Sequence, residues 1–155
     1  MKVYLAADHA GFELKEKVKK WLKDRGYTVH DEGNFVLADS DDYPDFIRIA
    51  AKEVASNPDE DVAILFGGSG QGEAIVANRY QGVRAAVFYG GNQKIIALSR
   101  EHNSTNVLSI GARFVSTEEA LTAIELWLNT PPAREARHLR RIAKIDELIK
   151  DEYEF

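Results

Sequence analysis

Short apolar runs alternate with helix-like patterns along almost the whole chain, and this alternation constrains the fold more than any other feature. The runs are VYLAA, YTVHD, VAILF, VRAAVF and VLSIG, and each is followed by a segment with helical periodicity. Strands that alternate with helices predict parallel strands in an open α/β sheet, joined by right-handed crossovers. The 155 residues suit one domain of this kind, from residue 1 to residue 155.

The first two predicted helices each have one apolar face. The segment after VYLAA keeps one apolar stripe, has lysines elsewhere and ends near Gly26. Pro44 opens the second helix, because proline is favoured at a first helical position. The predicted buried positions are Leu14, Val18 and Leu22 in the first helix, and Phe46, Ile49, Ala50 and Val54 in the second.

The predicted topology also locates the region where a ligand binds. In open parallel sheets, ligands bind beyond the carboxyl ends of the strands, where loops lead into helices. Three parts of this chain follow strands in that way: Asp8 with His9, the glycine loop that begins at Gly67, and the segment after Phe88. Functional side chains are expected at these places.

The glycine loop FGGSGQGEAIVAN, residues 66–78, carries four glycines and then one carboxylate. A nucleotide-binding P-loop needs lysine and then serine or threonine after its last glycine, whereas Glu73 and Ala74 follow Gly72 here. The dinucleotide fingerprint G-x-G-x-x-G also fits poorly, because three of the glycines alternate with other residues. The sequence therefore argues against ATP or GTP binding at this loop.

The backbone of the glycine loop suits a different chemistry. Successive amide N–H groups at a helix N-terminus bind phosphate or stabilise an oxyanion that develops during a reaction. A neighbouring carboxylate suits removal of a proton from a carbon beside a carbonyl, because the loop can hold the resulting enediolate. Glu73 taken alone, however, is more simply explained as a capping residue of the first helical turn.

Other polar residues near the predicted edge also have both structural and functional explanations. Asp8 suits a helix N-cap, and His102 suits a favourable partner for a helix C-terminus. As functional groups, His9 would face the ligand crevice and His102 would donate a proton to a sugar ring oxygen.

The predicted C-terminal helix has a basic stripe and an apolar side. The stripe consists of Arg134, Arg137 and Arg141. It is by default a solvated face, although guanidiniums grouped in this way also form a clamp for a phosphate group. The apolar side, expected to pack on the core or on a partner subunit, consists of Leu139, Ile142 and Ile149.

Composition excludes several other kinds of site. There is no cysteine, so disulfides, thiolate metal sites and thiol nucleophiles are ruled out. The four histidines show no close metal-ligand spacing, and an acidic cluster, Asp39, Asp41 and Asp42, lacks the calcium-loop pattern and is interpreted as a solvated loop. No metal or cofactor is expected.

The net charge of −5 argues against a nucleic-acid partner. No membrane span or signal-peptide pattern is seen, so a cytoplasmic protein is expected.

Five motifs, taken in order, resemble the ribose-5-phosphate isomerase B family, which also contains the galactose-6-phosphate isomerase subunits. They are DHAGFELK, DYPD, GGSGQGE, LSREHNSTNVLSIGAR and the R-x-x-x-R tail. The resemblance extends from Met1 to about Ile149. It implies a Rossmann-like three-layer sandwich with a mostly parallel central sheet, whose C-terminal helix packs on a partner subunit. It also implies a homodimer, paired into tetramers in some members, with active sites at the subunit interface.

The resemblance further implies interconversion of D-ribose 5-phosphate and D-ribulose 5-phosphate through a cis-enediolate, in the pentose phosphate pathway, without metal or organic cofactor. Many members carry a cysteine base where this chain has Gly67, and others use a glutamate after the glycines, which corresponds to Glu73. His102 would be the acid that assists ring opening. The residues implied to contact the substrate are Asp8, His9, Tyr43, Gly68, Ser69, Gly70, Gln71, Gly72, Asn103, Arg113, Arg137 and Arg141.

Three alternatives stay open at this point. The same catalytic groups would serve a six-carbon substrate, allose or galactose 6-phosphate, in a deeper pocket. A non-catalytic sugar-phosphate-binding module would keep the anion-binding loop and lose the chemistry, with Glu73 as a cap. Nucleic-acid binding through the arginine-rich tail is the weakest alternative, because the net charge is negative.

Overall fold

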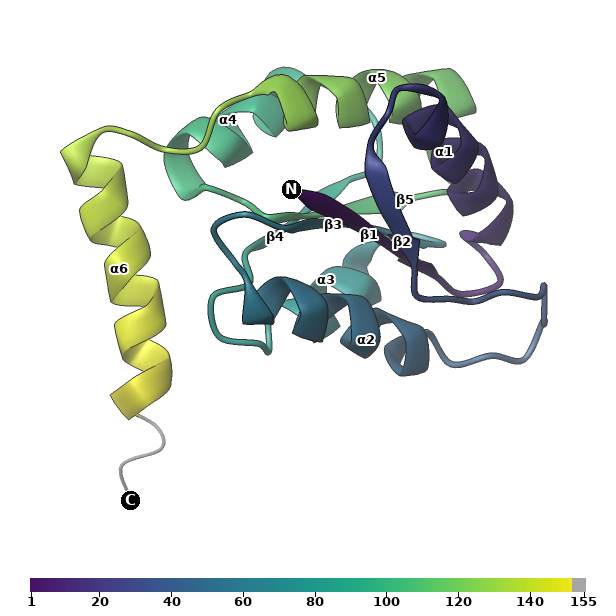
Figure 1. Cartoon of the computed structure of the whole chain (residues 1–155), viewed down its shortest axis with the longest axis horizontal. Coiled ribbons are helices and arrows are strands. Elements are labelled where there is room, and N and C mark those ends of the chain that lie inside the picture. The colour runs from purple at the N-terminus through teal and green to yellow at the C-terminus, as the bar shows by residue number, and fades with distance from the viewer. Residues whose placement is uncertain (152–155) are drawn as a thin grey trace.

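The computed structural model describes residues 1–151, with side chains up to residue 147, and shows a parallel sheet covered by helices on both faces (Figure 1). The strands are β1 (Lys2–Ala7), β2 (Thr28–Asp31), β3 (Val62–Gly67), β4 (Ala85–Phe88) and β5 (Val107–Gly111). They lie in the order β2-β1-β3-β5-β4, and every neighbouring pair is parallel. The predicted α/β fold is confirmed.

The helices are α1 (Phe12–Asp24), α2 (Tyr43–Ser56), α3 (Gln71–Ala77), α4 (Lys94–Asn103), α5 (Thr117–Asn129) and α6 (Ala136–Asp151). Helices α1, α4 and α5 cover one face of the sheet, while α2 and α3 cover the other (Figure 1). Helix α6 stands outside these layers and meets the rest of the chain mainly at α4. None of the helices in the described part of the chain combines the length and hydropathy that a membrane span requires.

The strands read as continuous apolar runs because both faces of the sheet are buried. In β1, Val3 and Leu5 belong to the core beneath α1 and α5, whereas Tyr4 and Ala6 belong to the core beneath α2. Successive side chains of a strand point to opposite faces, so each face receives every second residue. Trp127 of α5 is the largest fully buried side chain of the first core.

Two details of the predicted helices were wrong, and a third, Ile149, is not tested. Ile49 is exposed, and α2 instead faces the sheet with Ile47, Ala50, Ala51 and Val54. Apolar residues occur on several sides of this segment, so helical spacing alone did not select one face. Arg134 precedes the first turn of α6 and is not part of a helical stripe. Ile149 lies beyond the described side chains.

Lys15 is a further departure, because this lysine of α1 is fully buried and not on the solvated face. Its ammonium Nζ donates to Asp31 at 2.6 Å and to the carbonyl of Asn34 at 2.7 Å. A buried charge is tolerated when it is paired and hydrogen bonded in this way. Lys15 therefore ties α1 to the segment that follows β2.

The sheet order brings two predicted functional loops together. In the sheet, β2 lies on one side of β1 and the later strands β3, β5 and β4 lie on the other, so the strand order reverses between β1 and β3. At this point the loop after β1 packs tightly on the end of β3. A Cβ atom on Gly11 would collide with the backbone of Phe66, which explains why glycine occupies this position.

Candidate active site

A cavity of about 400 Å³ lies beyond the carboxyl ends of the central strands. It is lined by Asp8, Tyr43, Gly68, Ser69, Gly72, Glu73, Arg113 and Phe114. Seven of these eight residues were singled out from the sequence, and Phe114 was missed. An aromatic residue directly after Arg113, in the turn that follows β5, was the available signal. Tyr89 packs edge-on against Phe114, with 6.5 Å between the ring centroids, and so supports this wall of the cavity.

Glu73 occupies an unusual position in the first turn of α3. The residue is only 4% exposed, and its carboxylate lies directly over Gly67, where any Cβ atom would collide with it. The carboxylate therefore fills the volume that a side chain at position 67 would occupy. A capping box does not explain Glu73, because the N-cap residue is Gly70, which has no side chain.

The surroundings of Glu73 favour its neutral form. Burial raises the pKa of the carboxyl group above its usual range, and the nearby charge of Asp8 acts in the same direction. A hydrogen bond from the Glu73 backbone opposes this shift but does not cancel it. The result is a desolvated carboxyl group with increased proton affinity, as a general base requires.

The glycine loop is fixed through its carbonyl groups. The backbone N–H groups of Ala112 and Arg113 donate to Gly67 and Gly68 at 2.8 Å and 3.1 Å, and the Ser109 hydroxyl donates to Gly70 at 2.7 Å. Gly70 has φ = +76°, a left-handed conformation that glycine adopts without strain. The amide N–H groups of the loop residues 68–70 have no acceptor among the described residues. They are free to bind an anion.

Two glycines of the loop let larger side chains approach. A Cβ atom on Gly68 would lie 3.3 Å from Nη1 of Arg113, and one on Gly72 would lie 2.7 Å from Cζ of Tyr43. The guanidinium therefore lies close to the loop backbone at Gly68, and the phenol ring lies close to it at Gly72. Together with the loop amides they give the cavity a strongly hydrogen-bonding lining.

Asp8 is not the N-cap of α1, which is Gly11, but its side chain fixes the turn just before this helix. Its Oδ1 accepts hydrogen bonds from the amides of Ala10 and Gly11 at 2.9 Å and 3.2 Å, which stabilises the turn before α1. The same side chain is buried and lines the cavity. Asp8 is therefore a turn-capping residue that also faces the ligand-binding region.

His9, next to Asp8, is held by a residue that was misinterpreted. Nδ1 of His9 lies 2.7 Å from Oδ1 of Asp41, whose side chain is only 6% exposed. The interpretation of the acidic cluster as a solvated loop is correct for Asp39 and Asp42, which are exposed, and wrong for Asp41. The two partners are 32 residues apart in the chain, so no spacing rule predicted the pair.

Asp8, His9 and Asp41 also form a group of potential metal ligands, with donor atoms within 4.8 Å of one another. The linear spacing of the histidines gave no hint of this group. These donors already have protein partners: His9 and Asp41 bind each other, and Asp8 caps two amides. The structure thus gives each of them a role that needs no cation.

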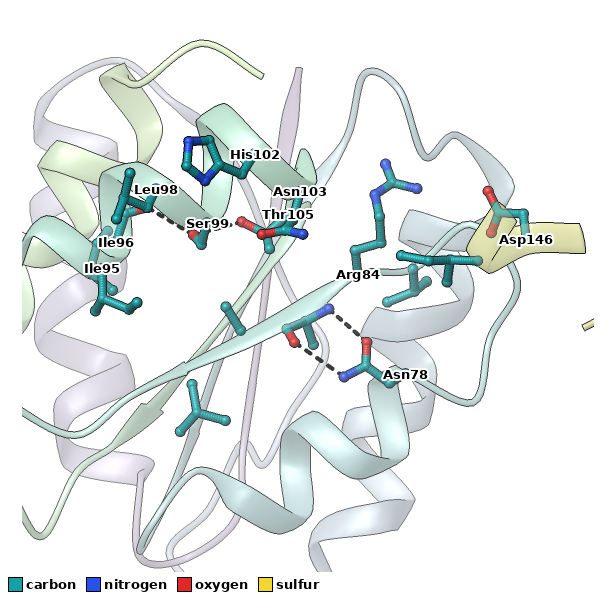
Figure 2. Close-up of a pocket in the computed structure, with 15 residues that line it drawn as sticks. Asn78, Arg84, Ile95, Ile96, Leu98, Ser99, His102, Asn103, Thr105 and Asp146 are labelled. Carbon is teal, nitrogen blue, oxygen red and sulfur yellow. Dashed lines mark hydrogen bonds between the residues drawn. The ribbon is translucent and has the colours of Figure 1, made fainter. Parts of the chain in front are cut away.

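The predicted acid lies in a second and larger cavity, of about 670 Å³, shown in Figure 2. His102 and Asn103, at the end of α4, line this cavity together with edge strand β4 and many apolar side chains. The His102 ring stacks on His138 of α6, with 4.3 Å between centroids. Neither Glu73 nor any glycine of the loop borders this second cavity. Within one protomer, therefore, the predicted base and the predicted acid lie in different cavities.

The remaining predicted residues lie outside both cavities. Arg137 and Arg141 are exposed on α6, and Arg137 pairs with Glu135 at 2.8 Å. Gln71 is exposed at the start of α3, and the half-buried His9, next to Asp8 in the chain, is not among the residues that line either cavity. The structure thus divides the predicted site into one group around the glycine loop and another on α4 and α6.

The sequence profile described as Ribose/Galactose Isomerase matches residues 3–145. The chain belongs to this family. Ribose-5-phosphate isomerase B of Mycolicibacterium paratuberculosis is 40% identical over 142 residues, which cover 92% of this chain and 87% of the relative. The isomerase of the same name from Escherichia coli K12 is 36% identical over 144 residues, or 93% of each chain.

Solved structures of ribose/galactose isomerases share the fold of this chain. Ribose-5-phosphate isomerase B of Mycoplasma genitalium, with bound ribulose-5-phosphate, superposes with a TM-score of 0.91 at 36% identity, covering 97% of both chains. The enzyme of Clostridium thermocellum gives a TM-score of 0.90 at 39% identity, covering 98% of this chain and 99% of its own. The predicted family and the predicted isomerase class are confirmed.

Proposed function

We propose that the protein interconverts D-ribose 5-phosphate and D-ribulose 5-phosphate through a cis-enediolate, with Glu73 as the base. The observation that carries the proposal is the buried Glu73 carboxylate, which lies over Gly67 beside loop amides with no acceptor among the described residues. The names of the relatives support a five-carbon sugar phosphate, and one relative binds ribulose-5-phosphate in its solved structure.

The geometry suits proton transfer between the two carbons of an aldose–ketose pair. Glu73 removes the proton from carbon 2 of the aldose and returns it to carbon 1, while the hydroxyl proton on the oxygen of carbon 2 passes to the oxygen of carbon 1. The amides of loop residues 68–70 stabilise the negative oxygen of the enediolate between these steps. The burial that raises the pKa of Glu73 strengthens it as a base, because a base works best when its pKa is near the working pH.

A second protomer supplies the groups that the glycine-loop cavity lacks. We infer a homodimer in which His102, the ring-opening acid, and Asn103 of one protomer reach the glycine-loop cavity of the other. The apolar side of α6 supports this arrangement, since Leu139 is 48% exposed and Ile145 is 44% exposed. Exposed apolar side chains of this kind suit a protein–protein interface. In this dimer Arg137 and Arg141 bind the phosphate, while Asp8, His9, Tyr43, Ser69, Gln71 and Arg113 complete the sugar-binding wall.

The direct test is isomerisation of ribose 5-phosphate by the purified protein, with a chelator present. We expect turnover that is insensitive to the chelator, because every proposed step uses protein groups. Rates on allose 6-phosphate and galactose 6-phosphate, measured side by side, should be lower. A faster six-carbon reaction would replace the proposed substrate, and binding of sugar phosphate without any turnover would replace isomerisation by a binding function.

The pH profile should reflect the burial of Glu73. The base must be ionised, so kcat should fall as the pH falls through the pKa of Glu73. Because burial raises that pKa, the acid midpoint should lie above the ordinary range of a glutamate side chain. Steady-state rates across the acid and neutral range, with melting curves to check folding at each pH, would measure it. An acid midpoint at the ordinary glutamate pKa, with the protein folded, would contradict the assignment.

A further inference from the structure

The pair formed by Asp41 and His9 takes no part in the proton-transfer steps above, and Asp41 has been given no role in substrate binding. Oδ1 of Asp41 lies 2.7 Å from Nδ1 of His9 and also accepts the His9 backbone N–H at 3.1 Å. The Asp41 side chain is 6% exposed, whereas the His9 side chain is 30% exposed. The buried carboxylate of Asp41 therefore holds both the ring and the backbone of His9.

Asn34 holds the other oxygen of the Asp41 carboxylate. Its side-chain Nδ2 donates to Oδ2 of Asp41 at 2.6 Å. Asn34 is itself buried, donates its backbone N–H to Ala7 at 2.8 Å, and accepts the Lys15 ammonium at its carbonyl at 2.7 Å. The carboxylate is thus anchored to β1 and α1, although the tip of the same loop, residues 35–37, is exposed.

This anchoring decides which nitrogen of His9 is available. A carboxylate at Nδ1 keeps the proton on that nitrogen, so Nε2 is the ring atom left for a ligand. No described residue makes a hydrogen bond to Nε2 of His9. A series of hydrogen bonds through Lys15, Asn34, Asp41 and His9 therefore connects a buried ammonium to a partly exposed imidazole beside Asp8.

We propose that Asp41 is a positioning residue that keeps His9 charged and presents its Nε2–H to an oxygen of the bound sugar phosphate. The inference rests on the proposed function, because it takes a sugar phosphate as the ligand. Asn34 supports this role by holding Asp41 in place. Neither residue needs to touch the substrate.

The charges around His9 act in agreement with this role. The hydrogen bond to Asp41 raises the pKa of His9, and the charges of Asp8 and Asp41 add to the increase. Desolvation, the second-largest effect, and the charge of Arg113, from the turn after β5, lower the pKa without cancelling the increase. The imidazolium is therefore favoured, and its charge is lost as the pH rises through the increased pKa.

Asp41→Asn is the first variant to measure. It removes the charge beside His9 and sets an amide donor against the Asn34 amide, so it also disturbs the loop. The double variant Asn34→Asp/Asp41→Asn removes that conflict, since the new carboxylate at position 34 accepts from the new amide at position 41. In this double variant the negative charge moves from position 41, which contacts His9, to position 34, whose side chain hydrogen bonds to position 41 and not to His9. Asp39→Asn, an exposed neighbour, is the matched control.

Two readouts separate positioning from folding. The first is the titration midpoint of His9 by NMR in the ligand-free protein, with the signal assigned by its loss in His9→Asn. We expect a lower midpoint in Asp41→Asn and in the double variant, while the double variant recovers the wild-type melting temperature. The second is KM for ribose 5-phosphate, which should rise about tenfold in both variants with a smaller change in kcat, as for a weakened charge-assisted hydrogen bond.

The dependence of KM on pH is a further test of the role of Asp41. In the wild type, KM should rise as the pH passes above the His9 midpoint, and in Asp41→Asn this rise should begin at lower pH. An unchanged His9 midpoint or an unchanged KM in Asp41→Asn overturns the proposal, as does full recovery of both in the double variant. A wild type that does not turn over ribose 5-phosphate overturns the proposed function instead, and the ligand-free His9 midpoint still decides whether Asp41 sets the charge.

Discussion

Glu73→Gln should remove nearly all turnover of ribose 5-phosphate. The substitution keeps the size of the side chain but removes the carboxylate that takes the proton. General-base catalysis typically contributes about 10²- to 10⁴-fold, so kcat should fall by roughly 10³-fold or more. KM should change little, because a glutamine side chain at this position would leave the loop amides, Tyr43 and Arg113 in place.

The same variant should make the folded protein more stable at neutral pH. Burial raises the pKa of Glu73 in the folded state, so the ionised side chain opposes folding above that pKa. The folded state binds this proton more tightly than the unfolded chain, and its contribution to stability is therefore lost as the pH rises. A glutamine side chain cannot ionise, so the variant should melt higher at neutral pH, by about 2–4 °C for each kcal/mol recovered.

Parallel measurements on Glu125→Gln separate this effect from a general loss of charge. Glu125 is exposed on α5, so its variant should match the wild type in kcat and in melting temperature. The stability gain of Glu73→Gln should shrink as the pH is lowered, since Glu73 of the wild type is then protonated. Retained turnover in Glu73→Gln would remove Glu73 as the base and direct attention to His9 or His102. A lower melting temperature at neutral pH would favour the capping explanation.

Two inactive variants should restore activity when they are mixed, if the active site is shared between protomers. Glu73→Gln lacks the base and His102→Asn lacks the acid. In a mixed dimer, one site carries both substitutions and the other carries neither. Random exchange of protomers makes about half of the dimers mixed, so about a quarter of wild-type activity should return.

The mixing experiment tests the division of the site that the structure displays. Glu73 lies in the glycine-loop cavity, whereas His102 lies with β4 and α4 in the second cavity. The two variants should be unfolded together, refolded and assayed beside each variant treated alone. Absence of activity in the mixture, with dimers formed and each variant folded, would place base and acid in one chain. Sedimentation equilibrium of the same samples would show whether a dimer forms.

The local patterns of the sequence determined the layered fold and the central part of the site. Apolar runs that are buried on both faces require helices on both sides, and the alternation of strands and helices provides them. Because loops after parallel strands meet at one edge, Asp8, the glycine loop and Glu73 were expected there, and they line one cavity. The glutamate in place of a lysine also distinguished this loop from a nucleotide-binding loop.

Tertiary structure decided which distant polar groups meet. The His9–Asp41 pair spans 32 residues, and the burial of Lys15 depends on Asp31 and Asn34 from another segment. Ile47 and not Ile49 faces the sheet, because both positions fit helical spacing and only packing against the strands distinguishes them. Local periodicity describes a segment by itself. Hydrogen bonds and contacts between segments depend on how the assembled sheet brings them together, and that is why the pairing of Asp41 with His9 emerged only from the folded chain.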